Sequence, residues 1–185
     1  MIAGLADRLG RAGHVVNIRH LKPRMVAAWR GQAEFVVVDP HGKPPRGAVL
    51  SLMKILAWLM EEWYFSLFQE KQETLLLCDR YYHDILVDPK RYRFGAPSWM
   101  AKLIGCLMPR PKLWILLDAS PEVLRARKQE VSWQESSRQC HAYRDFIRER
   151  NPFAIVDASA PLDHVIAEAE RAIAETIIRH EHNET

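Results

Sequence analysis

The sequence predicts an α/β fold in which a parallel sheet carries helices on both faces. Three continuous apolar runs, at residues 74–78, 113–117 and 153–156, have the pattern of strands covered on both sides. They alternate with longer segments of helical periodicity, which is typical of a doubly wound sheet. Ligands of such sheets bind at the carboxyl ends of the strands, so the residues after each run are the candidate site residues.

The other elements lie between these runs. Apolar residues three and four apart near the start predict a helix that ends by Gly13, and a short strand follows at residues 15–18. Pro121 suits the first turn of a helix. The further predicted helices cover residues 47–70 and 97–108, a segment from Pro121, a segment ending near Arg150, and residues 161–180, and residues 35–38 are a candidate edge strand.

Composition indicates one globular domain over residues 1–185. The chain is 48% hydrophobic and 26% charged, which argues against disorder, a fibrous protein and a disulfide-stapled miniprotein. A net charge of +3 is too small to indicate a nucleic-acid partner. Three widely spaced cysteines favour neither a disulfide framework nor a zinc site, and with no signal peptide pattern they predict a cytoplasmic protein.

The most apolar stretch, residues 49–60, is too short to span a membrane before it meets two glutamates. It predicts a buried or half-buried helix. Peripheral membrane contact is the alternative, because Lys43, Arg46 and Lys54 lie beside this apolar segment.

Asp79 and Arg80 form the strongest local signal for chemistry. The carboxylate leaves a strand at its carboxyl end and can hold a hydrated Mg²⁺, while the guanidinium beside it can bind phosphate with two hydrogen bonds. The plainer alternative is an aspartate that caps a turn beside a solvated arginine. Tyr81, Tyr82 and Arg93 follow in a loop crowded with charged side chains, which favours the functional interpretation.

Two weaker signals follow the later strands. Arg125, Arg127 and Lys128 can supply cations for phosphoryl transfer, although a solvated basic helix face explains them as well. The turn Asp157-Ala158-Ser159 is small enough for its backbone to approach a flat ring, although a plain helix cap is the alternative. The eight histidines do not have the spacing of a metal-binding site. His20 is expected in a loop, where a solvated side chain is favoured over contact with a substrate.

Taken together, these segments resemble the thymidylate-kinase-like branch of the P-loop nucleotide kinases over nearly the whole chain. The run Cys78 to Tyr81 is similar to the family's Asp-Arg-aromatic motif after its third strand. The run from Pro111 to Arg127 is similar to its fourth strand and following helix, and the run from Val156 to Val165 to its fifth strand and the turn against adenine.

The resemblance implies transfer of the γ-phosphoryl group of ATP, with Mg²⁺, to a nucleotide or another phosphate-bearing acceptor. Asp79 would organise Mg²⁺ through water. The resemblance implies that five residues bind the acceptor: Arg19, Arg80, Tyr81, Tyr82 and Arg93. Arg127 would stack near adenine, and Asp157, Ala158 and Ser159 would contact adenine or the cofactor. Arg125 or Lys128 would supply a cation to a lid, which is expected at residues 128–140. Arg19 matches a family Arg-acid-Pro run that here lacks its acid, which puts a thymidylate acceptor in doubt.

One family motif is missing. The sequence contains no G-x-x-x-x-G-K-[ST], and in this fold the strand and loop that carry it precede the first helix, which here begins at the first residue. In the family order 2-3-1-4-5 that strand is central, so the strands at 74–78 and 113–117 are expected to face each other across a gap. Three explanations stand: a start at an internal methionine, a decayed gene product, or a relative in which residues 35–38 fill the gap.

Three functions follow from these observations. The first is a nucleotide-kinase-like phosphotransferase, expected to be impaired in this 185-residue chain. The second is a non-catalytic binding or regulatory protein that keeps the fold. The third is a kinase-like protein of surface polysaccharide or lipid metabolism, suggested by the basic and apolar segment at residues 43–68. A homodimer is compatible with each of them.

Overall fold

The computed structural model describes residues 1–21, 44–69, 74–127 and 131–183. The chain forms two compact units, which we call unit 1 (residues 1–18 and 110–185) and unit 2 (residues 19–109). A single domain over the whole chain therefore stays a prediction. The predicted edge strand at residues 35–38 lies outside the described residues, as does Lys128.

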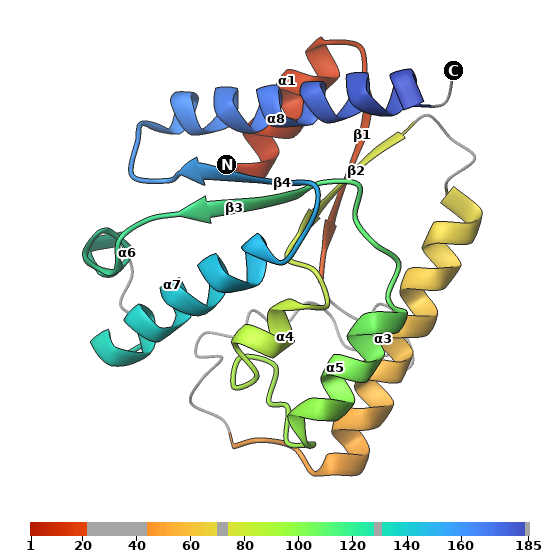
Figure 1. Cartoon of the computed structure of the whole chain (residues 1–185), viewed down its shortest axis with the longest axis vertical. Helices are drawn as coiled ribbons and strands as arrows, with labels where there is room; N and C mark the ends of the chain where they lie inside the picture. Colours follow the sequence, from red (N-terminus) through yellow and green to blue (C-terminus); the bar gives the residue numbers. More distant parts are fainter. Residues whose placement is uncertain (22–43, 70–73, 128–130, 184–185) are drawn as a thin grey trace. The chain divides into compact units, whose positions relative to one another are not determined.

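The strands form two separate sheets (Figure 1). Strand β1 (Val15–His20) pairs with β2 (Thr74–Asp79), and β3 (Trp114–Asp118) pairs with β4 (Phe153–Asp157). The second pair is parallel, and its register places Asp118 opposite Asp157. The α/β class is confirmed. Within the described residues no ladder joins β2 to β3, so one continuous doubly wound sheet is not seen.

Unit 1 builds its helices around β3 and β4. Helix α8 (Leu162–Asn183) contacts β4 and α1 (Ile2–Arg11), and α7 (Trp133–Arg148) contacts β3 and α6 (Pro121–Arg127). The Ser132 hydroxyl accepts a hydrogen bond from the Glu135 amide and begins α7 at Trp133. Residues 133–140 of the predicted lid are therefore helical, and Ser136 and Cys140 are buried there.

The expectation that the apolar strands are covered on both faces is wrong. Leu76 on β2, Leu117 on β3 and Ile155 on β4 are 38–46% exposed. Every strand of a two-stranded sheet is an edge strand, and its side chains are covered only where a helix packs on them. The continuous apolar runs correctly predicted strands but not their burial.

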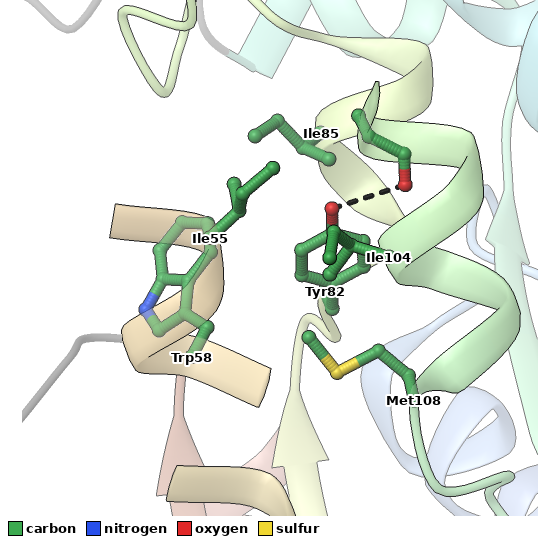
Figure 2. Close-up of a cluster of buried hydrophobic side chains, with 7 residues drawn as sticks. Ile55, Trp58, Tyr82, Ile85, Ile104 and Met108 are labelled. Atoms are coloured by element: carbon green, nitrogen blue, oxygen red, sulfur yellow. Dashed lines mark hydrogen bonds between the residues drawn. The ribbon is translucent and has the colours of Figure 1, made fainter. Parts of the chain in front are cut away.

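Unit 2 has its core between two helices and the segment after β2. Helix α3 (Ala48–Gln69) and α5 (Ser98–Leu107) match the two predicted helices, and a single turn, α4 (Asp84–Val87), lies between β2 and α5. Figure 2 shows Tyr82 between Trp58 and the side chains of α5, with its hydroxyl donating to the Ala101 carbonyl at 3.0 Å. The core residues are Ile55, Trp58, Tyr82, Ile85, Ala101, Ile104 and Met108. Among the helices described, none has both the length and the hydropathy of a membrane span.

Candidate functional site

The carboxyl ends of β1 and β2 bring a histidine and a carboxylate together. His20 Nδ1 lies 2.9 Å from Asp79 Oδ2, and both side chains are about half exposed. The Leu21 amide donates to the Asp79 carbonyl, which extends the β1–β2 pairing past His20. His20 is therefore the last residue of a strand, not the loop residue expected from the sequence.

Arg80 follows Asp79 in a backbone conformation that few residues adopt. Its φ of 70° lies in the left-handed region, which costs about 1–2 kcal/mol for a residue with a Cβ. Arg80 Nη1 donates to Asp84 Oδ2 at 2.7 Å, and the Tyr92 hydroxyl donates to the same oxygen. This hydrogen-bonded set holds the guanidinium directly beside the end of β2, and strained residues of this kind cluster at active sites and ligand-binding positions.

Lys54 on α3 lies within a cationic and aromatic cluster. Its ammonium lies 4.6 Å from the Trp58 ring centroid and 5.4 Å from that of Tyr92, and it donates to the Tyr92 carbonyl at 3.1 Å. Burial, together with the charges of Arg46 and Arg93, lowers the pKa of Lys54 to about 8. A group of three cations that repel one another is stabilised by an anion.

The loop that carries Arg93 is held close to the start of α3. The Arg46 amide donates to the Arg93 carbonyl, and Arg93 Nε donates to the Pro44 carbonyl, each at 2.9 Å. Arg93 also has a left-handed φ of 52°. Gly95 lies so close to this segment that a Cβ at that position would be 2.0 Å from the Arg46 carbonyl oxygen. The loop geometry therefore depends on a glycine at position 95.

Arg19, a predicted acceptor-binding residue, is enclosed by protein partners. Its guanidinium lies 2.9 Å from a carboxylate oxygen of Glu62 and 3.5 Å from one of Glu61, and it stacks over the Phe65 ring at 4.1 Å. The side chain is only 9% exposed. Burial raises the pKa of Glu62, and Arg19 opposes that rise. In this structure Arg19 neutralises two buried carboxylates of α3.

The two tyrosines after Arg80 are engaged with protein groups. The Tyr81 hydroxyl donates to the Pro109 carbonyl at 2.6 Å, and burial raises the pKa of Tyr81 and of Tyr82. Tyr82 is fully buried in the core of unit 2, so it has no surface to offer a ligand as the structure places it.

In unit 1 the ends of β3 and β4 are joined by hydrogen bonds. Arg144 Nε donates to both carboxylate oxygens of Asp118, at 3.0 and 2.9 Å. The Ala158 amide donates to the Asp118 carbonyl at 2.7 Å. Asp118 directly follows the predicted strand at residues 113–117, so its place at a strand end could be expected, whereas Arg144 lies 26 residues further on and carries no local signal.

The predicted adenine turn, residues 157–159, is held by hydrogen bonds between its own residues. The Ser159 amide and hydroxyl both donate to Asp157 Oδ1, and these bonds hold the pKa of Asp157 below its ordinary value. Because the amides of Ala158 and Ser159 are both used within the unit, a base at this turn would have to meet carbonyl oxygens or the small side chains.

The two described arginines of α6 have different neighbours. The Arg125 guanidinium lies 6.0 Å from the Trp133 ring centroid. Arg127, the last residue of α6, makes the smallest contribution to the lowered pKa of Asp157, after the Ser159 hydrogen bonds and the charge of His164.

Several residues beside the β2 end were missed or undervalued by sequence reasoning. Asp84 and Tyr92 belong to the charged segment that follows Arg80, but the sequence alone indicates no role for either residue. The sequence suggested Lys54 only as a cation for peripheral membrane contact, because its neighbours in the chain are apolar. The aromatic rings and arginines that surround Lys54 in space come from other parts of the chain as well and cannot be recognised from those neighbours.

Asp79 is the residue that could hold Mg²⁺. Mg²⁺ keeps several waters and is commonly bound by one or two carboxylates together with substrate phosphates, which an exposed carboxylate at a strand end fits. Across the described part of the chain, no group of three or more His, Cys, Asp or Glu side chains forms a protein-only metal site.

Comparison with known proteins adds no family to this description. No protein-family model and no curated protein matches this chain.

Proposed function

We propose that this chain is a thymidylate-kinase-like phosphotransferase domain whose unit 2 binds a phosphate-bearing acceptor at the carboxyl end of β2. The observation that carries the proposal is the strained Arg80 beside Asp79. A guanidinium fixed in this way can donate two hydrogen bonds to a phosphate.

The contacts of Tyr92 extend this site to a second group of cations. Its hydroxyl shares Asp84 Oδ2 with Arg80, and its ring and carbonyl contact Lys54. Lys54 is in turn near Arg46 and Arg93. The acceptor is therefore an anion with a phosphate at Arg80 and further negative charge toward Lys54, such as a nucleoside monophosphate or a sugar phosphate.

ATP and Mg²⁺ are the cofactors that the family resemblance implies. Asp79 would hold Mg²⁺ through water, and His20 would orient that carboxylate by its hydrogen bond. Because the sequence has no G-x-x-x-x-G-K-[ST], we expect this chain by itself to bind acceptor with little or no phosphoryl transfer.

Calorimetric titration with a panel of nucleoside monophosphates and sugar phosphates tests the acceptor site. At least one phosphate ester should bind, its unphosphorylated counterpart should bind far more weakly, and Arg80→Gln should reduce its affinity by roughly 10–100-fold. Arg138→Gln is the matched control, because Arg138 is also a partly exposed arginine paired with a carboxylate on its own helix or turn.

Absence of binding across the panel, or equal losses in the two arginine variants, would overturn the proposal, because no acceptor site would remain. Robust ATP-dependent phosphoryl transfer by the 185-residue chain would agree with a phosphotransferase and would overturn only the expectation that transfer needs the missing motif.

A further inference from the structure

His20 and Asp79 have the arrangement of a histidine oriented by a carboxylate. Asp79 Oδ2 lies 2.9 Å from Nδ1 of the imidazole, and an ionised carboxylate can only accept, so the proton of the neutral ring is on Nδ1. Nε2, on the other side of the ring, then carries the lone pair. A histidine held in this way can act as a base or as a nucleophile.

The two side chains are positioned by paired strands and are open to small molecules. His20 ends β1 and Asp79 ends β2, and the Leu21 amide donates to the Asp79 carbonyl at 3.4 Å. The His20 side chain is nevertheless 59% exposed. The backbone therefore fixes where the ring and the carboxylate start, while more than half of the imidazole stays accessible.

Arg80 adds a cation beside this pair. It follows Asp79 directly, so the two Cα atoms are about 3.8 Å apart. Its guanidinium is 39% exposed and is held by Asp84. A guanidinium binds phosphoryl oxygens and offsets the repulsion between a phosphate dianion and a nearby carboxylate. Three residues at one strand end thus contribute a nucleophile, a carboxylate that orients it and a cation for a phosphoryl group.

We propose that His20 accepts a phosphoryl group from an acyl phosphate, which this chain hydrolyses without ATP. Nε2 attacks the phosphorus, and the N–P bond forms while the P–O bond to the acyl group breaks. The carboxylate product leaves with the electron pair and needs no proton. The ring becomes positively charged, and the Asp79 carboxylate stabilises that charge through the hydrogen bond from Nδ1.

Water completes the reaction. It attacks the phosphorus of phosphohistidine, the electron pair of the N–P bond returns to Nε2, and both water protons leave with dihydrogen phosphate. An acyl phosphate fits this site better than a phosphate ester, because an alkoxide leaving group needs a proton donor. The inference rests on the proposed function only through phosphate binding by Arg80.

Incubation of the 185-residue chain with acetyl phosphate, followed by peptide mass spectrometry, tests this inference. The buffer omits Mg²⁺, which would compete for Asp79. The phosphate should be on His20, stable in alkali and labile in acid. His164 is the internal control, because its side chain is similarly exposed at 56% but its Nε2 lies 3.9 Å from a Glu168 oxygen, beyond hydrogen-bond distance. His20 should be labelled at least about tenfold faster than His164.

Variants of Asp79 test its positioning role. Asp79→Asn should slow labelling of His20 by at least about tenfold, because an amide can hold the other tautomer of the ring. Asp79→Glu keeps a carboxylate and should retain more of the rate than Asp79→Asn does. Arg80→Gln should also slow the labelling. Circular dichroism of each variant confirms that it is folded.

Three results would overturn the inference: alkali-labile phosphate on Asp79, equal labelling of His20 and His164, or equal rates in wild type and Asp79→Asn. None of them bears on phosphate-ester binding, which calorimetry measures separately. Fast labelling of His20 in a chain that binds no phosphate ester would sustain this inference and overturn the proposed function.

Discussion

His20 Nδ1 lies 2.9 Å from the Asp79 carboxylate, where the paired strands β1 and β2 end. Fifty-nine residues separate the two in the chain. Both side chains are about half exposed, so their contact contributes little to stability, in the range of about 0–1 kcal/mol. The pair lies at the carboxyl ends of two paired strands and directly beside Arg80, where we propose that the acceptor binds.

Asp79→Asn should remove the Mg²⁺-dependent part of nucleotide affinity while changing stability by less than about 1 kcal/mol, because it takes away the anionic oxygen but keeps the shape. Titration of ADP with and without Mg²⁺ measures this. Asp145→Asn, the same change at an exposed carboxylate on α7 away from the proposed site, serves as the control and should retain the Mg²⁺ effect. Equal Mg²⁺ dependence in wild type and Asp79→Asn would exclude Asp79 as the Mg²⁺ residue.

Arg19→Met should destabilise the chain by about 3–5 kcal/mol near neutral pH, because it leaves Glu61 and Glu62 buried without their cation. Urea denaturation measures the loss.

The pH dependence follows from Glu62. A raised pKa means that the folded state binds more protons than the unfolded state above pH 4.5, so stability falls as pH rises through the folded pKa. The loss in Arg19→Met should therefore be larger at pH 7.5 than at pH 5. A loss below 1 kcal/mol at both would contradict a structural role and favour an acceptor-binding one.

Lys54→Met should abolish a rise in stability between about pH 8 and 10. Since the pKa of Lys54 is about 8 in the folded state and ordinary in the unfolded state, the unfolded state holds its proton longer, and the free energy of unfolding rises with pH by up to ~3 kcal/mol. Denaturation curves of both proteins at pH 7 and pH 9.5 give the comparison. Parallel pH profiles would show that Lys54 is not perturbed.

Gly95→Ala should cost about 1–3 kcal/mol and weaken any anion binding, because its Cβ would meet the Arg46 carbonyl oxygen and separate the Arg93 loop from α3. Gly47→Ala is the matched control, since a Cβ there meets nothing within 4 Å. Thermal unfolding and phosphate-ester titration distinguish the two variants. A Gly95→Ala protein as stable as Gly47→Ala would show that the loop can move away without loss.

The helices and strands were largely predictable because their signals are local. Apolar spacing, Gly13 and Pro121 lie within a turn or two of the elements they define, and the observed bounds of α3, α5 and β3 differ from the predicted ones by one residue at each end. The polar residues at the strand ends were found in the same way. Asp79, Asp118 and Asp157 each close a strand.

Pairing and burial were decided by tertiary structure, because they depend on residues far apart in the chain. Arg19 meets Glu62 from 43 residues away, and Arg144 meets Asp118 from 26. Neighbouring tyrosines have different surroundings, with Tyr82 in the core between α3 and α5 and Tyr81 bonded to Pro109. No local pattern distinguishes such cases.

The sequence by itself determined the α/β class, the order of the elements and the acidic ends of the strands, since each follows from side chains within a few residues. Only the tertiary structure decided that the strands form two separate pairs, that Arg19 is enclosed, that Lys54 lies among rings and arginines, and that α3 turns its charges inward. These depend on which surfaces of distant segments meet, and burial changes the free energy of a charge far more than its neighbours in sequence do.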